Sequence, residues 1–493
     1  MMKQKARKWI TFTLRWGIAV AGIWWVLAKT PFTDKLTLVR ANNTIQRVDV
    51  LNDPPEDAPA FQVKNPGGQK TWSVARDAVW TQPDRSSVHI HLDGKNEKVK
   101  LLAIRPGGHY SPGEAPAELL VRDPSTGRQL RIAPPPGYTV RVPYPMVDIG
   151  IVRLVRFANI GFLLAALLVL PLSYLITSRR WHLLLGALDI RMTQARTFVL
   201  NMVGAFYNTF MPGSTGGDLI KAYYAARHTP HRVRAVLSVI VDRVIGLIAL
   251  IILGGVMASV QWQVPECRKV AIICGAMLLL TAVGLVVFYH PAWRKAMGVD
   301  WLIARMPMQK QVHHALEAMQ LYGRRPTASL TALVMTFPVH MTTVLSATFA
   351  GLAFGIKMPL LYYWTVVPVV TLVGAIPISP QGAGVMEAFA VLLTRTQGVT
   401  ISQAIALTIA IRFGQMFWNL VAGIFVLRGG YHAPTEKEQE TLETDEPEPN
   451  NLARTNVEIP DPVSEREEKI HRGDAEAQRG RIRSCQVAIQ SKP

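Results

Sequence analysis

Six ionisable residues lie in or beside long apolar segments of this sequence. They are Asp218, Lys221, Asp242, Arg243, Glu387 and Arg412. Charged side chains are costly in hydrocarbon, so they usually face the interior of a helix bundle or a wet cavity and mark a functional site. Three are acidic and three are basic, so they can neutralise one another. Asp242 and Arg243 project about 100° apart on one helix, and we expect each to have its own partner.

The alternative is that these charges form buried ion pairs that only fix helix packing. For Asp218 and Lys221, which are close together at the end of a predicted hairpin, both interpretations stay open. For Asp242, Arg243 and Arg412, which fall within predicted spanning helices, we favour a functional role.

Two apolar segments are interrupted by runs of proline and glycine, MPGSTGGD at 211–218 and PISPQGAG at 377–384. Irregular backbone inside a membrane is tolerated only where protein shields it or where it lines a wet cavity. Basic residues flank the first interrupted segment, so we expect 196–226 to enter and leave on the cytoplasmic side as a re-entrant hairpin. The second hairpin, 358–395, must enter from outside if the polar C-terminal tail is to end inside.

The interruptions have the chemistry to bind a phosphate. Glycine lets backbone approach a ligand closely, and a helix that begins after such a break presents N–H groups and a positive dipole end. The candidate residues are Gly216, Gly217, Gly382 and Gly384, with Lys221, Arg243 and Arg412 as countercharges. Neutral hydrogen bonds could come from Asn208, Ser214, Thr215 and Ser379. Each of these four could equally cap a helix end, which is the better interpretation for Ser214 and Ser379.

Membrane helices are the elements that must position these residues. Of the 493 residues, 49% are hydrophobic and 18% charged. Several uncharged runs, such as 157–176, 270–289 and 328–354, approach the ~20 residues that cross a ~30 Å hydrocarbon core. We expect Arg179–His182 to end the first of these helices on the cytoplasmic side. The net charge of +19 comes from basic residues beside these runs, which indicates cytoplasmic loops and not a nucleic-acid-binding protein. The three cysteines form no disulfide framework or zinc spacing, and we expect no metal or cofactor.

The chain divides into four regions. Residues 1–30 are a signal anchor or signal peptide, 31–150 an extracytoplasmic β-rich domain, 151–430 a transmembrane domain, and 431–493 a disordered cytoplasmic tail. Short alternating runs predict the strands, namely Lys35–Val39, Val88–Leu92, Lys98–Ile104, Gln129–Ile132 and Tyr138–Val142. His89 and His91 share a strand face, and a solvated face explains them better than a metal site.

Within 151–430 the order helix, interrupted hairpin, helix occurs twice. Inverted repeats with broken helices place a transport site at the interface of the repeats. We therefore expect a mostly α-helical polytopic membrane protein with two inverted repeats containing re-entrant hairpins. We also expect Asp242, Arg243, Glu387 and Arg412 to converge on a cavity between the repeats.

Three motifs, in order, resemble the signature regions of the lysylphosphatidylglycerol synthase transmembrane-region family. They are NTFMPGSTGGDLIK at 208–221, SVIVDRVIG at 238–246 and PISPQGAGVME at 377–387. The resemblance implies the flippase-like domain also found in multiple-peptide-resistance-factor proteins, which translocates aminoacylated phospholipids or acts in lipid and lipid-linked glycan pathways. It assigns motif positions to Asn208, Pro212, Gly216, Gly217, Asp218, Asp242, Arg243, Pro377, Gly382, Gly384 and Glu387. The chain departs from the family at Lys221, where arginine is expected, and at Met386, where a basic residue often stands.

The favoured function is a flippase-like protein of the plasma membrane that translocates or binds a phospholipid or a polyprenyl-linked lipid. The alternatives are a membrane-embedded lipid-modifying transferase, or an accessory scaffold whose β-domain binds an extracytoplasmic ligand or partner. An enzyme is the weaker interpretation, because no separate catalytic domain fits between the helices and the tail is too polar to fold. The sequence also has no GxxxxGK[ST] motif, so ATP-driven pumping by this chain alone is not expected.

Overall fold

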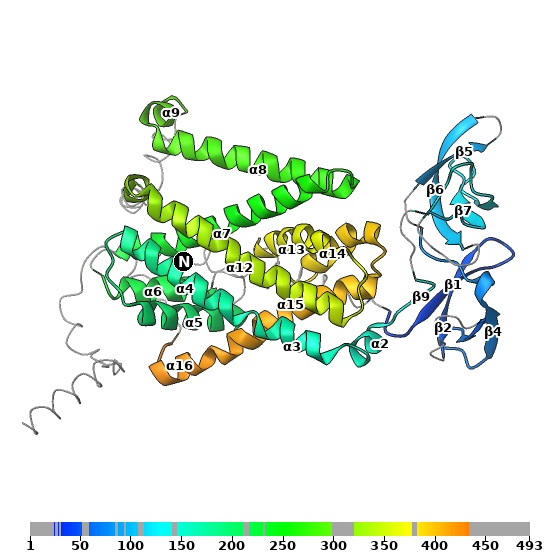
Figure 1. Ribbon diagram of the computed structural model, residues 1–493, viewed down its shortest axis with the longest axis horizontal. Coiled ribbons are helices and arrows are strands. Elements are labelled where there is room, and N and C mark those ends of the chain that lie inside the picture. Colours follow the sequence, from blue (N-terminus) through cyan, green and yellow to red (C-terminus); the bar gives the residue numbers. More distant parts are fainter. Residues whose placement is uncertain are drawn as a thin grey trace, which may run out of the picture.

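The computed structural model describes residues 31–51, 59–83, 87–92, 95–106, 113–140, 145–210, 216–229, 232–297, 320–376 and 382–432, together with Trp24 and Ala28. The predicted signal segment, apart from those two positions, and the predicted tail from residue 433 lie outside the described residues. The described chain forms a helical domain with a β-domain at one end (Figure 1).

Helices make up most of the chain after residue 150. They are α2 (Ile151–Arg156), α3 (Ile160–Leu168), α4 (Pro171–Ala187), α5 (Gln194–Phe210), α6 (Gly216–Ala226), α7 (Arg232–Val260), α8 (Pro265–Tyr289), α9 (Pro291–Ala296), α12 (Pro326–Ala353), α13 (Leu360–Ala375), α14 (Val385–Thr394), α15 (Ile401–Val421) and α16 (Gly423–Gly429). Among the described residues, five helical stretches are long and apolar enough to cross a membrane. They are Ile160–Ala187, α7, most of α8, α12 and Ile401–Gly429.

The outward face of these helices is apolar. On α8, Ile272, Leu279 and Leu280 are each more than half exposed, at 58%, 68% and 74%. A continuous apolar surface of this kind is unfavourable in water and is the normal lipid-facing surface of a spanning helix. The chain is therefore a mostly α-helical, multi-pass integral membrane protein, as the sequence predicted.

One predicted boundary is wrong. The Arg179–His182 segment was expected to end the first spanning helix, but α4 continues to Ala187. Arg180 and Trp181 are consequently buried inside the helical domain. The reason is that the apolar residues after His182 extend the helix by more than a turn, while Arg180 finds partners within the protein.

Each interrupted segment forms a helical hairpin. In the first, α5 and α6 run antiparallel, since Asn201 contacts Lys221 near one end and Asn208 contacts Gly217 near the other. In the second, α13 packs against α14, and the Tyr362 hydroxyl donates to the carbonyl of Leu393. The four helices have 17, 11, 16 and 10 residues, so at ~1.5 Å per residue each is shorter than a ~30 Å hydrocarbon core. The inverted relation of the two halves stays a prediction.

The β-domain consists of two antiparallel sheets. The first has the strand order β4-β3-β2-β1-β9 and the second β5-β6-β7-β8. The strands are β1 (Lys35–Val39), β2 (Ile45–Val50), β3 (Ala60–Lys64), β4 (Thr71–Ala75), β5 (Ser87–Leu92), β6 (Lys95–Arg105), β7 (Glu118–Arg122), β8 (Gln129–Ile132) and β9 (Val147–Asp148). Each sheet has its own buried apolar cluster, one centred on Leu36 and Val48 and the other on Val99 and Leu119.

Most of the predicted strands are present, with one exception. Residues 138–140 form no strand. The backbone of Val140 instead bonds to Gly113 and Glu114 in a loop. On β5, Val88 and Ile90 are buried and His89 is exposed, which agrees with a solvated histidine face.

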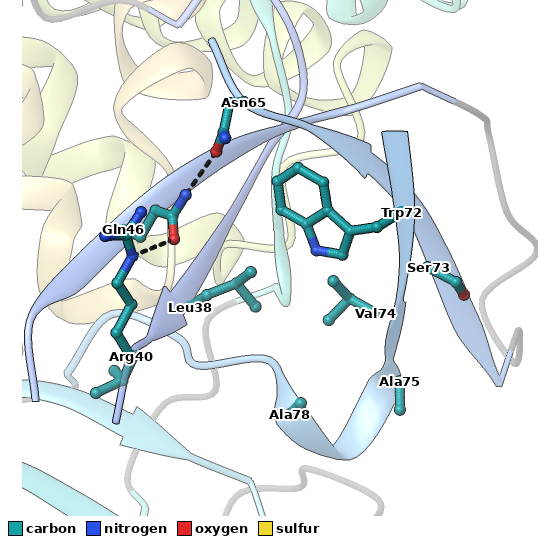
Figure 2. Close-up of a pocket in the computed structure, with 10 residues that line it drawn as sticks. Leu38, Arg40, Gln46, Asn65, Trp72, Ser73, Val74, Ala75 and Ala78 are labelled. Carbon is teal, nitrogen blue, oxygen red and sulfur yellow. Dashed lines mark hydrogen bonds between the residues drawn. The ribbon is translucent and has the colours of Figure 1, made fainter. Parts of the chain in front are cut away.

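A gap of about 560 Å³ separates the β1–β2 and β3–β4 hairpins (Figure 2). The two hairpins pair through their backbones at one end, where Asp49 and Val50 oppose Lys64 and Val63. Beyond these pairs a side-chain contact bridges the hairpins: Gln46 Nε2 donates to Asn65 Oδ1 at 2.6 Å. Within the β1–β2 hairpin, Arg40 Nε donates to Gln46 Oε1 at 2.8 Å. Leu38, Trp72 and Val74 form the apolar wall of the gap.

Asp34 joins the β-domain to the helices. Its carboxylate accepts the backbone N–H of Gly150 at 2.7 Å and pairs with Arg153 at 2.6 Å. The hydrogen bond satisfies the backbone N–H of Gly150 at the start of α2. The ion pair joins α2 to Asp34, the residue that precedes β1. These contacts hold the sheets at the end of the domain where α3 begins (Figure 1).

Candidate functional site

A cavity of about 390 Å³, lined by charged, neutral polar and apolar side chains, lies among α4, α5, α6, α7, α12, α13 and α15. Its charged lining residues are Arg180, Asp218, Lys221, Asp242 and Arg243. Uncharged polar groups come from both halves of the helical domain, including Tyr174, Asn201, Thr371, Gln415 and Asn419. Tyr174 also donates to Asn419 at 2.7 Å, which connects α4 with α15 across the cavity wall.

Asp242 is the central acceptor of the cavity. It is buried on α7, and its Oδ1 accepts from Arg180 Nε at 2.8 Å. Its Oδ2 lies 3.7 Å from Lys221 Nζ. Arg180 also donates to Thr336 Oγ1 at 2.8 Å. One carboxylate thus connects α7 with α4 and α6, and through Arg180 with α12.

Lys221 is held more loosely than Arg180. Its ammonium donates to Asn201 Oδ1 at 3.1 Å and lies 4.4 Å from the centre of the Trp181 ring. A cation over an aromatic face is stabilised by the ring quadrupole, more so where water is excluded. Trp181 is itself fixed because its indole N–H donates to Ser238 Oγ at 3.1 Å.

Asp218 forms a second ion pair with Arg243, between α6 and α7. These side chains are 26% and 31% exposed, so this pair is closer to solvent than the Asp242 cluster. Asp242 and Arg243 have different partners, as the angle between neighbouring helical residues predicted. Asp218 and Lys221 each pair with a residue of α7.

The first hairpin depends on a close approach of two glycines. A Cβ on Gly217 would overlap the carbonyl oxygen of Gly204 on the facing helix. The N–H of Gly217 donates to Asn208 Oδ1 at 2.9 Å, so Asn208 caps the start of α6. The expectation that this N–H is free for phosphate is therefore wrong, because the hairpin itself supplies an acceptor.

The second hairpin uses an internal acceptor as well. Gly384 lies at φ +82° and donates its N–H to Glu387 Oε2 at 2.7 Å. Glu387 Oε1 accepts from Arg412 on α15, also at 2.7 Å. Gly382, at φ +70°, also needs glycine's conformational freedom.

Glu387 and Arg412 do not belong to the described lining of the cavity. All four charges were predicted to converge on this cavity, and two of them do not. Asp242 and Arg243 line the cavity, while Glu387 and Arg412 pair with each other at the α14–α15 contact. The physical reason is that Glu387 is 2% exposed and already satisfied by Gly384 and Arg412.

The two hairpins share one arrangement. In each, an acidic residue at the third position of the second helix pairs with an arginine 25 residues later, on the following helix. The pairs are Asp218 with Arg243 and Glu387 with Arg412. This recurrence supports the predicted repeat.

Sequence reasoning missed Arg180, Trp181, Asn201 and Thr336. Arg180 was placed at a helix end because basic residues gather on the cytoplasmic side, although the apolar residues after His182 signal a longer helix. Asn201 precedes Asn208 by about two helical turns, so the shared face could have been recognised. Of the predicted residues, Pro212, Ser214, Thr215, Pro377 and Ser379 lie outside the described part of the chain.

Replacing Gly217 by alanine should prevent the first hairpin from closing. Because the new methyl group meets backbone and not a flexible side chain, we expect a loss of at least about 3 kcal/mol in the free energy of unfolding. The apparent melting temperature of the purified protein measures this. Gly275→Ala on α8, where a Cβ has no neighbour within 4 Å, is the matched control. Equal melting temperatures for the two variants would refute the close approach.

Residues 150–423 match the profile of the family described as lysylphosphatidylglycerol synthase TM region. The chain is 22% identical over 302 residues to a UPF0104 membrane protein of Pyrococcus horikoshii, covering 56% of this chain and 90% of that protein. It is 23% identical over 267 residues to a UPF0104 membrane protein of Methanothermobacter thermautotrophicus, covering 49% of this chain and 77% of the relative. Since the family profile matches more than half of its length, the chain belongs to the lysylphosphatidylglycerol synthase transmembrane-region family.

Proposed function

We propose that the protein binds the headgroup of a membrane lipid in the cavity around Asp242 and translocates that lipid across the membrane. The observation that carries the proposal is the cavity itself, which has five charged lining residues inside a bundle of apolar helices. A packed bundle needs no such space for stability, because apolar side chains could fill it at no desolvation cost.

The size and composition of the cavity suit a lipid headgroup. Its volume of about 390 Å³ falls within the ~300–1,000 Å³ of typical ligand pockets. Charged side chains come from α4, α6 and α7, while α13 and α15 contribute only neutral polar groups such as Thr371 and Gln415. A headgroup could therefore meet charge on one wall and neutral hydrogen-bonding groups on the other.

The orientation follows from the basic residues. Arg227, Arg232, Arg324 and Arg325 lie at or near the ends of α6, α7 and α12, at the end of the helical domain opposite the β-domain (Figure 1). Basic residues favour the cytoplasmic side of a membrane. This placement supports our proposal that the β-domain lies outside and the C-terminal tail in the cytoplasm of a plasma-membrane protein.

A scaffold whose β-domain binds an external ligand is the second candidate. The gap between the β1–β2 and β3–β4 hairpins favours it, since Trp72 and the Arg40–Gln46–Asn65 chain combine an aromatic wall with polar groups (Figure 2). Under this alternative the helical cavity is dispensable. The two candidates therefore differ in what happens when the cavity is filled.

Filling the cavity should stop lipid movement. Ala205 lines it from α5, and Ala205→Trp would place an indole ring in the space that a headgroup needs. We expect vesicles containing this variant to move acyl-labelled phospholipid between leaflets at the protein-free rate. The control is Ala276→Trp, the same change of side chain at an exposed position on α8. If both variants elute as the parent protein does and move lipid equally well, the scaffold is the better account.

The Glu387–Arg412 pair has a positioning part in this proposal, because it fixes α15, which carries Gln415 and Asn419 into the cavity. Glu387→Gln and Arg412→Lys keep size or charge but change the hydrogen-bond geometry. We expect each to lower the rate of lipid movement about tenfold per inserted molecule. Variants that insert normally, melt at the parent's temperature and move lipid at its rate would show that the pair has no part in transport.

A further inference from the structure

The charged residues that line the cavity do not balance. Arg180, Lys221 and Arg243 are three cations, and Asp218 and Asp242 are two carboxylates. The segments 211–215 and 377–381, next to the hairpins, contain no ionisable residue that could restore the balance. The described lining therefore has one positive charge in excess.

Lys221 has no carboxylate of its own in the described lining, because it shares Asp242 with Arg180. Arg243 pairs with Asp218, and Arg180 takes Oδ1 of Asp242 at hydrogen-bond distance. The 3.7 Å between Lys221 Nζ and Asp242 Oδ2 exceeds the ~2.7–3.2 Å of a hydrogen bond. An ammonium group has three donors, and in the described residues one of them has a neutral acceptor, Asn201. Lys221 is nevertheless only 5% exposed.

The second hairpin shows that a hairpin of this kind can form without a lysine at the position of Lys221. Asp218 and Arg243 correspond to Glu387 and Arg412 in the shared arrangement. The positions that correspond to Lys221 and Asp242 are then Ala390 and Ile411, which are buried and apolar. Lys221 and Asp242 are thus additions to a hairpin that can be built without them.

A buried cation that lacks a full countercharge is unfavourable unless an anion joins it. We infer that the cavity selects a headgroup with a net charge of −1, a phosphodiester without an amine, and that Lys221 is its phosphate ligand. This inference rests on the proposed function and names its substrate class. A zwitterionic headgroup brings its own ammonium, which would compete with Lys221 for the phosphate. A lysyl-substituted headgroup carries a net positive charge and would be the poorest substrate.

The test uses the purified full chain in vesicles that contain trace acyl-labelled phosphatidylglycerol, phosphatidylcholine or lysylphosphatidylglycerol. We expect the wild type to move phosphatidylglycerol about tenfold faster than phosphatidylcholine, and lysylphosphatidylglycerol slowest, since a hydrogen bond to a charged group contributes about a factor of ten or more. Equal rates for the three lipids would overturn the inference and leave the proposed function standing. If no lipid moves above the protein-free rate, the proposed function itself fails.

Variants then assign the selectivity to one side chain. Lys221→Gln should reduce the ratio of phosphatidylglycerol to phosphatidylcholine rates to about one, whereas Lys221→Arg should keep the wild-type preference. Lys357→Gln removes an exposed positive charge outside the cavity and should change nothing. A preserved ratio in Lys221→Gln that elutes as a single folded species would overturn the role of Lys221. If Lys221→Gln does not fold, the Lys221→Arg and wild-type ratios still decide the selectivity.

A soluble phosphodiester or phosphate has the same chemistry as the lipid headgroup. Uptake of radiolabelled glycerol phosphate into the vesicles distinguishes the two sources. We expect no uptake above that of protein-free vesicles, because the flanking surface is apolar and suits acyl chains. Uptake of glycerol phosphate without movement of phosphatidylglycerol would overturn the lipid as the substrate.

Discussion

The need to pair charges away from water shapes the helical domain. Asp242 is buried among apolar helices, and breaking a buried pair by removing one partner costs about 3–5 kcal/mol. Its carboxylate is therefore surrounded by Arg180 from α4 and Lys221 from α6, while Thr336 of α12 accepts the other contact of Arg180. These contacts bring four helices to one point. The cavity lies where these helices meet, because side chains that bind the Asp242 carboxylate do not fill the space as closely packed apolar side chains would.

Close backbone packing makes this arrangement possible. Gly204 and Gly217 let α5 and α6 approach until Asn208 caps the second helix, and the same approach brings Asn201 within reach of Lys221. In the second hairpin Gly384 and Glu387 perform the capping within α14. An ion pair of the same spacing then joins each hairpin to the following helix. Among the described residues, further charged side chains line the cavity at the first hairpin and not at the second. The ion pair that fixes each hairpin is thus separate from the additional charges that line the cavity.

The sequence predicted the fold better than the site. Apart from the end of α4, long apolar runs predicted the spanning helices to within a few residues. The two proline- and glycine-rich interruptions predicted both hairpins. Which residues pair in the site depends on the tertiary fold. Arg180 and Asp242 are 62 residues apart, and no local pattern distinguishes Arg180 from its exposed neighbour Arg179. The predicted convergence of Glu387 and Arg412 on the cavity failed because charge alone does not reveal that a carboxylate is already satisfied by the backbone of its own helix.

The most direct test of the account is a cryo-EM structure of the full chain in nanodiscs of phosphatidylglycerol. The account predicts lipid density that enters the cavity from the bilayer, with its phosphate about 3 Å from Lys221 Nζ. Asp242 would keep Arg180 as its partner. A cavity that contains water alone while every headgroup stays at the membrane surface would contradict a lipid site between these helices.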